Sequence, residues 1–167
     1  MVDLALPRRL HAVGQRAIGQ ARARRSATVE AEHVLLAILA VRSSPATTKL
    51  ASARLDYDAL VAALADERER SLAAAGIAPI AAAALTATPR STIPGWGASV
   101  RDLLRRADTP AAKDGRDGAV EIELSIAILQ ARIGTVPRAL AVAGLDRSAL
   151  IAALAAGSET RSGRLES

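Results

Sequence analysis

The residues with the clearest chemical potential lie in one short stretch, TVEAEHVLLAIL, at residues 28–39. It places Glu30, Glu32 and His33 directly before an apolar run, and His33 is one of only two histidines in the chain. Carboxylate and imidazole groups side by side could hold a metal ion, act as an acid–base pair, bind a cationic ligand or stabilise a helix start. Their spacing discriminates between these uses.

The spacing disfavours a metal centre and a catalytic centre. Helical zinc sites use two histidines four residues apart, and no second histidine lies near His33 in the predicted helix. Glu32 and His33 are adjacent, so on a helix they point about 100° apart and do not converge on one ion. The sequence also lacks a G-x-S-x-G motif, a phosphate-binding glycine loop and any cysteine. We therefore expect no enzymatic activity, no metal and no cofactor.

Glu32 has two open interpretations. It lies three residues before Leu35 and seven before Leu39, which places it on the apolar face of the predicted helix. An acid in a first turn stabilises a helix electrostatically, and Glu30 needs no other explanation. Glu32 lies at the edge of the stripe that should be buried, where a carboxylate could hold a guanidinium in a bidentate ion pair. Spacing alone leaves both helix stabilisation and ligand binding open.

The composition indicates an all-α fold. The chain has 167 residues, of which 50% are hydrophobic, with only one Trp, one Tyr and no Phe. Alanine, which is abundant, favours helices and is poorly represented in strands. The net charge is +5, but acidic residues are interspersed, so we expect the arginines to cover solvated helix faces. The sequence shows no signal peptide and no bilayer-spanning apolar stretch, and we expect a soluble, cytoplasmic protein.

An internal repeat organises the chain. Residues 35–65 align without a gap to residues 125–155, at a constant offset of 90. The matched pairs include Ile38 with Ile128, Leu55 with Leu145, Asp56 with Asp146 and Leu64 with Leu154. The repeat predicts one module over residues 1–156, with repeat one at 4–72, a linker at 73–95 and repeat two at 96–156. Residues 157–167 are expected to form a flexible, polar tail.

Each repeat is predicted to contain four helices. The first set lies at about residues 7–25, 28–39, 45–54 and 56–72, and the second at about 96–108, 119–132, 136–143 and 146–156. Thr28 and Asp56 are predicted N-caps, and Gly144 is a predicted helix stop.

The duplicated pattern and the EHVLLAIL stretch at residues 32–39 resemble the Clp N-terminal domain, the module at the front of ClpA- and ClpC-type AAA+ unfoldases. Members of that family commonly read GTEHLLLGLL where this chain reads EAEHVLLAIL. The later Gly144-Leu145-Asp146 element is similar to the family's AARVLxxLGVD. The resemblance spans roughly residues 4–156 and implies a globular, all-α module of about eight helices in two pseudo-twofold-related repeats.

The resemblance also implies a non-enzymatic, protein-binding function in chaperone-linked proteolysis. Domains of this family dock adaptor proteins and substrates for the unfoldase, and some bind proteins marked by phosphoarginine. In those members the glutamate of the E-H motif holds the guanidinium, a role that carries over to Glu32, with His33 beside it. Leu10, Val13 and Val100 are predicted to lie between the repeats, as core residues.

The second repeat departs from the family pattern. The constant offset places Ile122-Glu123 where the first repeat has its E-H pair. Glu121 or Glu123 could serve as the second ligand-binding carboxylate only if the start of the helix shifts. The threonine that the family usually has near the start of each repeat's first helix is replaced by Pro7 and Gly97. These departures weaken the expectation of phosphoarginine binding.

The predicted partners are peptides, adaptors or degradation-marked proteins of a Clp-type system. The sequence has no ATPase module after the second repeat, so we expect either a domain excised from an unfoldase or a free-standing decoy or regulator, and Met1 and the short tail favour the second. The alternative is a small basic DNA-binding regulator whose helix after Thr28 enters the major groove. Glu30 and Glu32 at the head of that helix would repel phosphate, so nucleic acid is the less favoured partner, and no membrane partner is expected.

Overall fold

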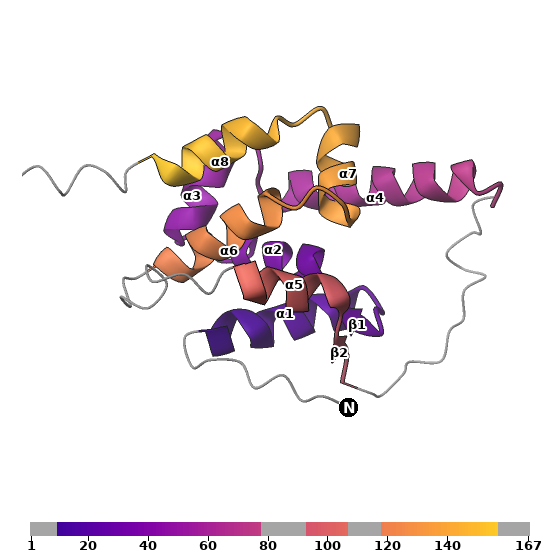
Figure 1. The fold of residues 1–167 in the computed structure, drawn as a ribbon, viewed down its shortest axis with the longest axis horizontal. Coiled ribbons are helices and arrows are strands. Elements are labelled where there is room, and N and C mark those ends of the chain that lie inside the picture. The colour runs from indigo at the N-terminus through magenta and orange to yellow at the C-terminus, as the bar shows by residue number, and fades with distance from the viewer. Residues whose placement is uncertain (1–9, 78–92, 107–117, 157–167) are drawn as a thin grey trace, which may run out of the picture.

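The computed structural model describes residues 10–77, 93–106 and 118–156. Within these ranges it contains eight helices and one pair of two-residue strands, which confirms the all-α prediction (Figure 1). The helices are α1 (His11–Ala23), α2 (Ala31–Leu39), α3 (Pro45–Ser52), α4 (Tyr57–Ala74), α5 (Ala98–Arg106), α6 (Ala119–Leu129), α7 (Thr135–Val142) and α8 (Arg147–Ala155). None of these helices is both long and apolar enough to cross a membrane. The predicted start at Pro7, most of the predicted linker and the predicted tail lie outside the described residues.

Local sequence signals account for several helix ends. Asp56 caps α4, as predicted, because its carboxylate accepts a hydrogen bond from the backbone N–H of Ala59 at 2.8 Å. Asp146 caps α8 in a similar way, accepting from the N–H of Ser148 at 2.8 Å. Gly144 follows the end of α7 with a φ of 68°, a left-handed conformation that glycine adopts without strain. The predicted helix stop at Gly144 is therefore confirmed.

The predicted helix starts at Thr28 and Trp96 are wrong. Both residues belong to short strands, β1 (Thr28–Val29) and β2 (Gly95–Trp96), which pair in parallel. The N-cap of α2 is instead Glu30, whose backbone N–H donates to Nδ1 of His33 at 2.9 Å. This arrangement is a capping box in which an imidazole replaces the usual glutamate or glutamine. Histidine is not the residue by which such a box is normally identified, so the sequence pattern pointed to Thr28.

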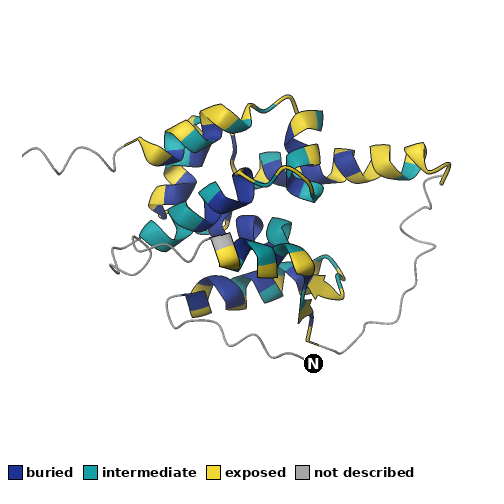
Figure 2. Ribbon diagram, in the orientation of Figure 1, coloured by how far each residue is buried: buried dark blue, intermediate teal, exposed yellow. Residues whose placement is uncertain are grey.

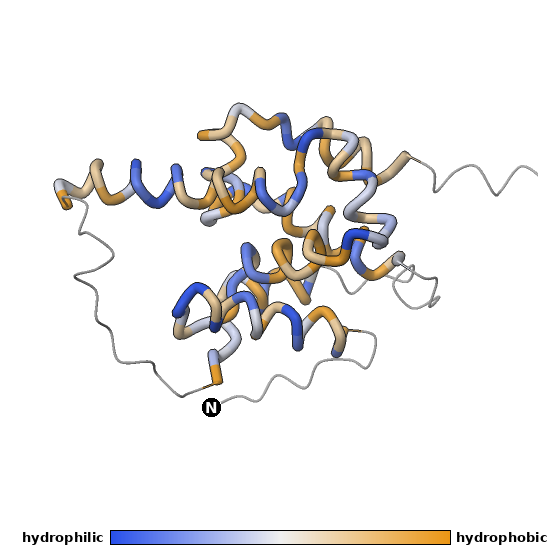
Figure 3. Tube along the Cα trace, turned by 180° about the vertical axis from the view of Figure 1, so that it is seen from behind, coloured by the Kyte–Doolittle hydropathy of each residue, from blue (hydrophilic) through white to orange (hydrophobic). Residues whose placement is uncertain are grey.

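The core is aliphatic and centres on α2 and α6. These two helices lie between α1 and α5 on one side and α3, α4, α7 and α8 on the other (Figure 1). Every residue of α2 from His33 to Leu39 is buried (Figure 2). Leu10, Val13 and Val100 are buried as well, which confirms them as core residues. In contrast, α4 projects beyond the core, and its turn at residues 66–70 is hydrophilic (Figure 3).

The helix boundaries fit the 90-residue offset of the sequence repeat. Helices α3 and α7 start and end 90 residues apart, α2 and α6 end 90 residues apart, and α4 and α8 start 90 residues apart. This agreement is what a duplication would produce, although the pseudo-twofold relation between the repeats stays a prediction.

The later helices of the two predicted repeats pack against each other. Helix α3 packs against α8, and α4 packs against α7. Lys49 of α3 donates from Nζ to the carbonyl of Leu154 at 2.8 Å and also to the carbonyl of Ala156, so its charge lies at the C-terminal end of α8. Arg138 of α7 donates from Nε to Oε1 of Glu67 in α4 at 2.6 Å. Each packing contact is thus reinforced by one cationic side chain.

Candidate functional site

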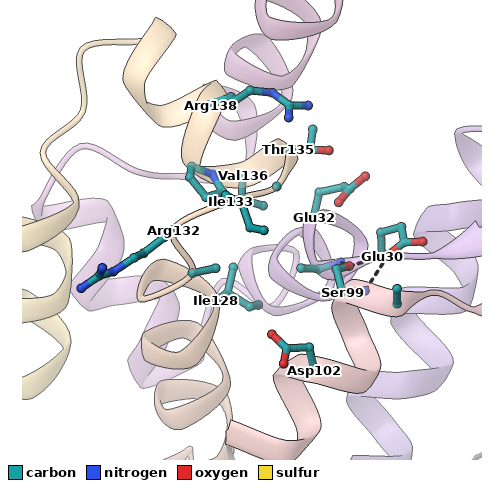
Figure 4. Close-up of a pocket in the computed structure, with 15 residues that line it drawn as sticks. Glu30, Glu32, Ser99, Asp102, Ile128, Arg132, Ile133, Thr135, Val136 and Arg138 are labelled. Carbon is teal, nitrogen blue, oxygen red and sulfur yellow. Dashed lines mark hydrogen bonds between the residues drawn. The ribbon is translucent and has the colours of Figure 1, made fainter.

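A groove of about 650 Å³ lies where the N-terminal ends of α2 and α5 meet the connection between α6 and α7 (Figure 4). Residues 30–32 of α2 and three residues of α5 form one wall, and residues 128 and 131–138 form the other. Carboxylates, arginines and aliphatic side chains all contribute to the lining. Because the lining residues come from segments far apart in the sequence, the site depends on how α2 and α5 pack near the connection between α6 and α7.

One wall is fixed by a joint between α2 and α5. The backbone N–H of Ser99 donates to Oε2 of Glu30 at 3.2 Å, and the Ser99 hydroxyl donates to the same oxygen. That hydroxyl also accepts from the backbone N–H of Ala31 at 2.8 Å. Glu30 therefore satisfies a free amide at the start of α5 and holds the first turns of α2 and α5 together. Helix electrostatics, the role assigned to Glu30 from sequence, is only part of its function in the structure.

Gly97 makes room for this joint. A Cβ atom on Gly97 would lie 1.8 Å from Oε1 of Glu30, far inside van der Waals contact. Any residue with a Cβ atom would displace the Glu30 carboxylate. The contact between Glu30 and Ser99 therefore requires a glycine at residue 97.

Glu32 lies in the first turn of α2 and lines the groove. Within the described residues, its carboxylate has no hydrogen bond or ion pair to another residue. Burial raises the pKa of Glu32 above its ordinary value, and nearby Glu30 and Glu67 raise it further, against the lowering effect of its own backbone N–H and of Arg24. A desolvated carboxylate without a partner is unfavourable in the free protein, and a bound cation would relieve that cost.

His33 does not line the groove. Its side chain is only 4% exposed, and its Nδ1 accepts the hydrogen bond from Glu30 that starts α2. Burial lowers the pKa of His33, the charge of Arg24 lowers it further, and Glu30 raises it. The imidazole is thus neutral near pH 7, with its proton on Nε2 because Nδ1 is an acceptor. The structure gives His33 a structural position beside the ligand-binding candidate Glu32.

The opposite wall contains a cation that the sequence analysis missed. Arg138 lines the groove together with Thr135 and Val136, and its ion pair with Glu67 anchors it. Glu67 also accepts from the Ser71 hydroxyl at 2.8 Å. Burial would raise the pKa of Glu67, but the hydrogen bonds from Arg138 and Ser71 outweigh it, and the pKa lies below its ordinary value. The anchor is therefore a charged, buried carboxylate.

A signal for this anchor is present in the sequence. Glu67 lies seven residues after Leu60 and three after Leu64, so it occupies the apolar face of α4. An acid at such a position is buried on folding and needs a partner. The identity of the partner, Arg138, depends on the packing of α4 against α7.

The carboxylates proposed for the second repeat lie outside the groove. Glu121 forms an ion pair with Arg16, with 3.6 Å between Oε1 and Nη2. Glu123 has a buried Oε2 atom without a hydrogen-bond partner in the described part of the chain. Ile122, which the offset aligns with Glu32, packs against the core. The structure therefore does not bring Glu121 and Glu123 together with Glu32.

Comparisons with known proteins assign no family to the chain. No protein-family model matches it, and no curated protein is significantly similar to it. Its function is therefore inferred from the groove and the sequence patterns.

Proposed function

We propose that the chain is a non-enzymatic protein-binding module that holds a segment of a partner protein in the groove between its two repeats. The observation that carries this proposal is the position of Glu32, a desolvated carboxylate without a hydrogen bond or ion pair to another described residue, on the wall of a groove of about 650 Å³. A group of this kind is suited to bind a cationic side chain, and arginine is the best fit because its guanidinium can pair with both carboxylate oxygens.

Aliphatic side chains in the same groove favour a protein ligand. Ile128 and Val136 line it, and Ile133, in the same lining, keeps 89% of its surface exposed. An exposed isoleucine at a groove is a suitable contact for an apolar side chain of a partner. A segment with a basic residue next to an aliphatic one would therefore satisfy both features.

The resemblance to Clp N-terminal domains supports the same class of function. It suggests that the partners are adaptors or degradation-marked substrates of a Clp-type unfoldase. Glu32 would then hold an arginine or phosphoarginine side chain through its guanidinium. The Glu30 carboxylate occupies the space that a family-type threonine at Gly97 would fill, so phosphate recognition would need other donors.

DNA binding has less support from the site. The wall formed by α2 and α5 carries the carboxylates of Glu30, Glu32 and Asp102. Carboxylates repel the phosphate backbone, which supplies most of the affinity in non-specific DNA binding.

A peptide selection tests the proposal. A random peptide library displayed on phage is selected against the full chain, and the affinity of enriched peptides is measured by fluorescence anisotropy. We expect peptides with a basic residue, whose affinity falls about tenfold or more in Glu32→Gln. The control is Glu69→Gln, at an exposed position of α4 outside the groove, which should bind like wild type. Equal affinity for wild type and Glu32→Gln, or no enrichment, would overturn the proposal.

A further inference from the structure

We infer that the groove recognises a segment with two opposite charges, a cationic side chain at Glu32 and a carboxylate at Arg138. This inference rests on the proposed function and deepens it by naming the charge pattern of the ligand. It follows from how the groove's own charges are paired.

Glu32 and Arg138 line the same groove but do not pair with each other. Arg138 forms its ion pair with Glu67, whereas Glu32 has no hydrogen bond or ion pair to another of the described residues. In Figure 4, Thr135 and Arg138 lie to one side of Glu32, and the Glu32 carboxylate does not reach the Arg138 guanidinium. Both charges are thus available to a single occupant that supplies the complementary charge to each.

Arg138 is well suited to bind an anion because it is both held and exposed. Its Nε donates to Glu67, which is itself buried and hydrogen-bonded to Ser71. This contact uses one donor, while 60% of the side chain remains exposed, so the terminal N–H groups of the guanidinium are open to a ligand. Because Glu67 fixes the side chain in advance, little conformational entropy is lost when a carboxylate binds. Glu67 is thereby a positioning residue for Arg138.

The surroundings of the two charges restrict the occupant to a short polypeptide segment. Thr135 adds a hydroxyl beside Arg138, and Val136 and Ile133 add aliphatic surface (Figure 4). The carboxylates on the α2 and α5 wall disfavour a polyanion, which would meet them along its whole length. Arg132 lines the groove too, but its guanidinium points away from Glu32, so it is not assigned to the ligand (Figure 4).

The test uses fluorescein-labelled peptides that contain one arginine and one aspartate. In the set, one, two or three leucine or alanine residues separate the charges, in both orders, and binding is measured by anisotropy. For the tightest peptide, we expect replacement of arginine by citrulline or of aspartate by asparagine to weaken binding to wild type by about tenfold each.

The protein variants assign each charge. In Glu32→Gln the citrulline effect should vanish and the asparagine effect should remain. In the double variant Glu67→Gln, Arg138→Gln the pattern should be reversed, and this variant avoids leaving a buried glutamate unpaired. The single variant Glu67→Gln keeps Arg138 but removes the ion pair that holds its side chain in place. It should therefore lower the affinity for the aspartate peptide and leave the affinity for the asparagine peptide unchanged. A purely structural role for Glu67 would weaken both peptides equally.

Two results would overturn the inference. In the first, the asparagine peptide binds as tightly as the aspartate peptide, while the citrulline peptide binds more weakly. The groove then recognises only the cationic side chain, and the proposed function stands without the second charge. If no peptide of the set binds, the two-charge pattern is wrong, and the phage selection then decides the proposed function separately. If the double variant does not fold, Arg138→Lys takes its place, because it keeps the positive charge but lacks the planar guanidinium. This variant must still bind the aspartate peptide more tightly than the asparagine peptide.

Discussion

The starts of α2 and α6 differ, although the later turns of the two helices match at a constant offset. Helix α2 starts at the Glu30–His33 capping box, and its neighbour Glu32 lines a groove. Helix α6 starts after Gly118, which has a φ of 79° and lies against Pro45. The buried turns of both helices, ending at Leu39 and Leu129, serve the core, while the first turns have taken different roles.

This difference separates the buried turns of the two helices, which are alike, from their first turns, which are not. The apolar turns of both helices are buried in the core, so packing constrains the size and shape of their side chains. The first turn begins at the edge of the core, where its backbone amides need capping but many side chains can provide it. In α2 the capping groups come from Glu30 and His33, which leaves Glu32 available for a ligand.

The largest difference between the two helix starts is expected for His33 and its aligned residue Glu123. His33→Ala removes a buried ring and leaves the Glu30 N–H without its acceptor, so it should reduce the free energy of unfolding by about 2–4 kcal/mol. Glu123→Ala removes a carboxylate oxygen that is buried without a partner, so the change should lie within about 0.5 kcal/mol. Urea unfolding followed by circular dichroism measures both, and equal losses would contradict the distinction.

A second pair compares Gly118 with its aligned residue Thr28. Gly118→Ala forces a positive φ on alanine and places a Cβ 2.8 Å from Pro45, so we expect a loss of about 1–3 kcal/mol. Thr28 is exposed in a two-residue strand, and Thr28→Ala should cost less than about 0.5 kcal/mol. Thermal unfolding ranks the two variants by their loss of stability. If Gly118→Ala is as stable as Thr28→Ala, the start of α6 does not require a glycine.

The joint between α2 and α5 can be broken at Gly97. Gly97→Ala should push the Glu30 carboxylate away from Ser99 and reduce the free energy of unfolding by about 1 kcal/mol, since the displaced group is a flexible side chain. Gly95→Ala is the matched control, because a Cβ there meets nothing within 4 Å. If chemical denaturation finds both variants equally stable, the Glu30–Ser99 contact does not join the helices.

The smallest effect concerns the charge of Glu32. Its raised pKa means that the folded chain holds this proton to higher pH than the unfolded chain, so the stability contributed by Glu32 is lost as pH rises above about 4.5. Glu32→Gln should therefore be more stable than wild type at pH 7, by about 0.5–1 kcal/mol, with a smaller gain at pH 4. Unfolding curves at the two pH values check this, with Glu69→Gln as the control that should show no such gain.

The fold was largely predictable from sequence, because helical spacing, the 90-residue offset and the caps at Asp56 and Gly144 are local or repeated signals. The position of Glu32 in a first turn followed from the same spacing. The contacts that build the groove were not predictable. Glu30 meets Ser99 across 69 positions and Arg138 meets Glu67 across 71, and both depend on how the repeats pack.

We propose above that the groove beside the start of α2 is the ligand-binding site, and binding there can be mapped residue by residue. The most direct measurement is a 15N-HSQC titration of the labelled full chain with a library-selected peptide. We expect amide shift changes concentrated at residues 30–32, 98–102 and 131–138, and none above background at residues 119–123 of α6. Shift changes centred on residues 119–123, or absent from residues 30–32, would contradict the proposal.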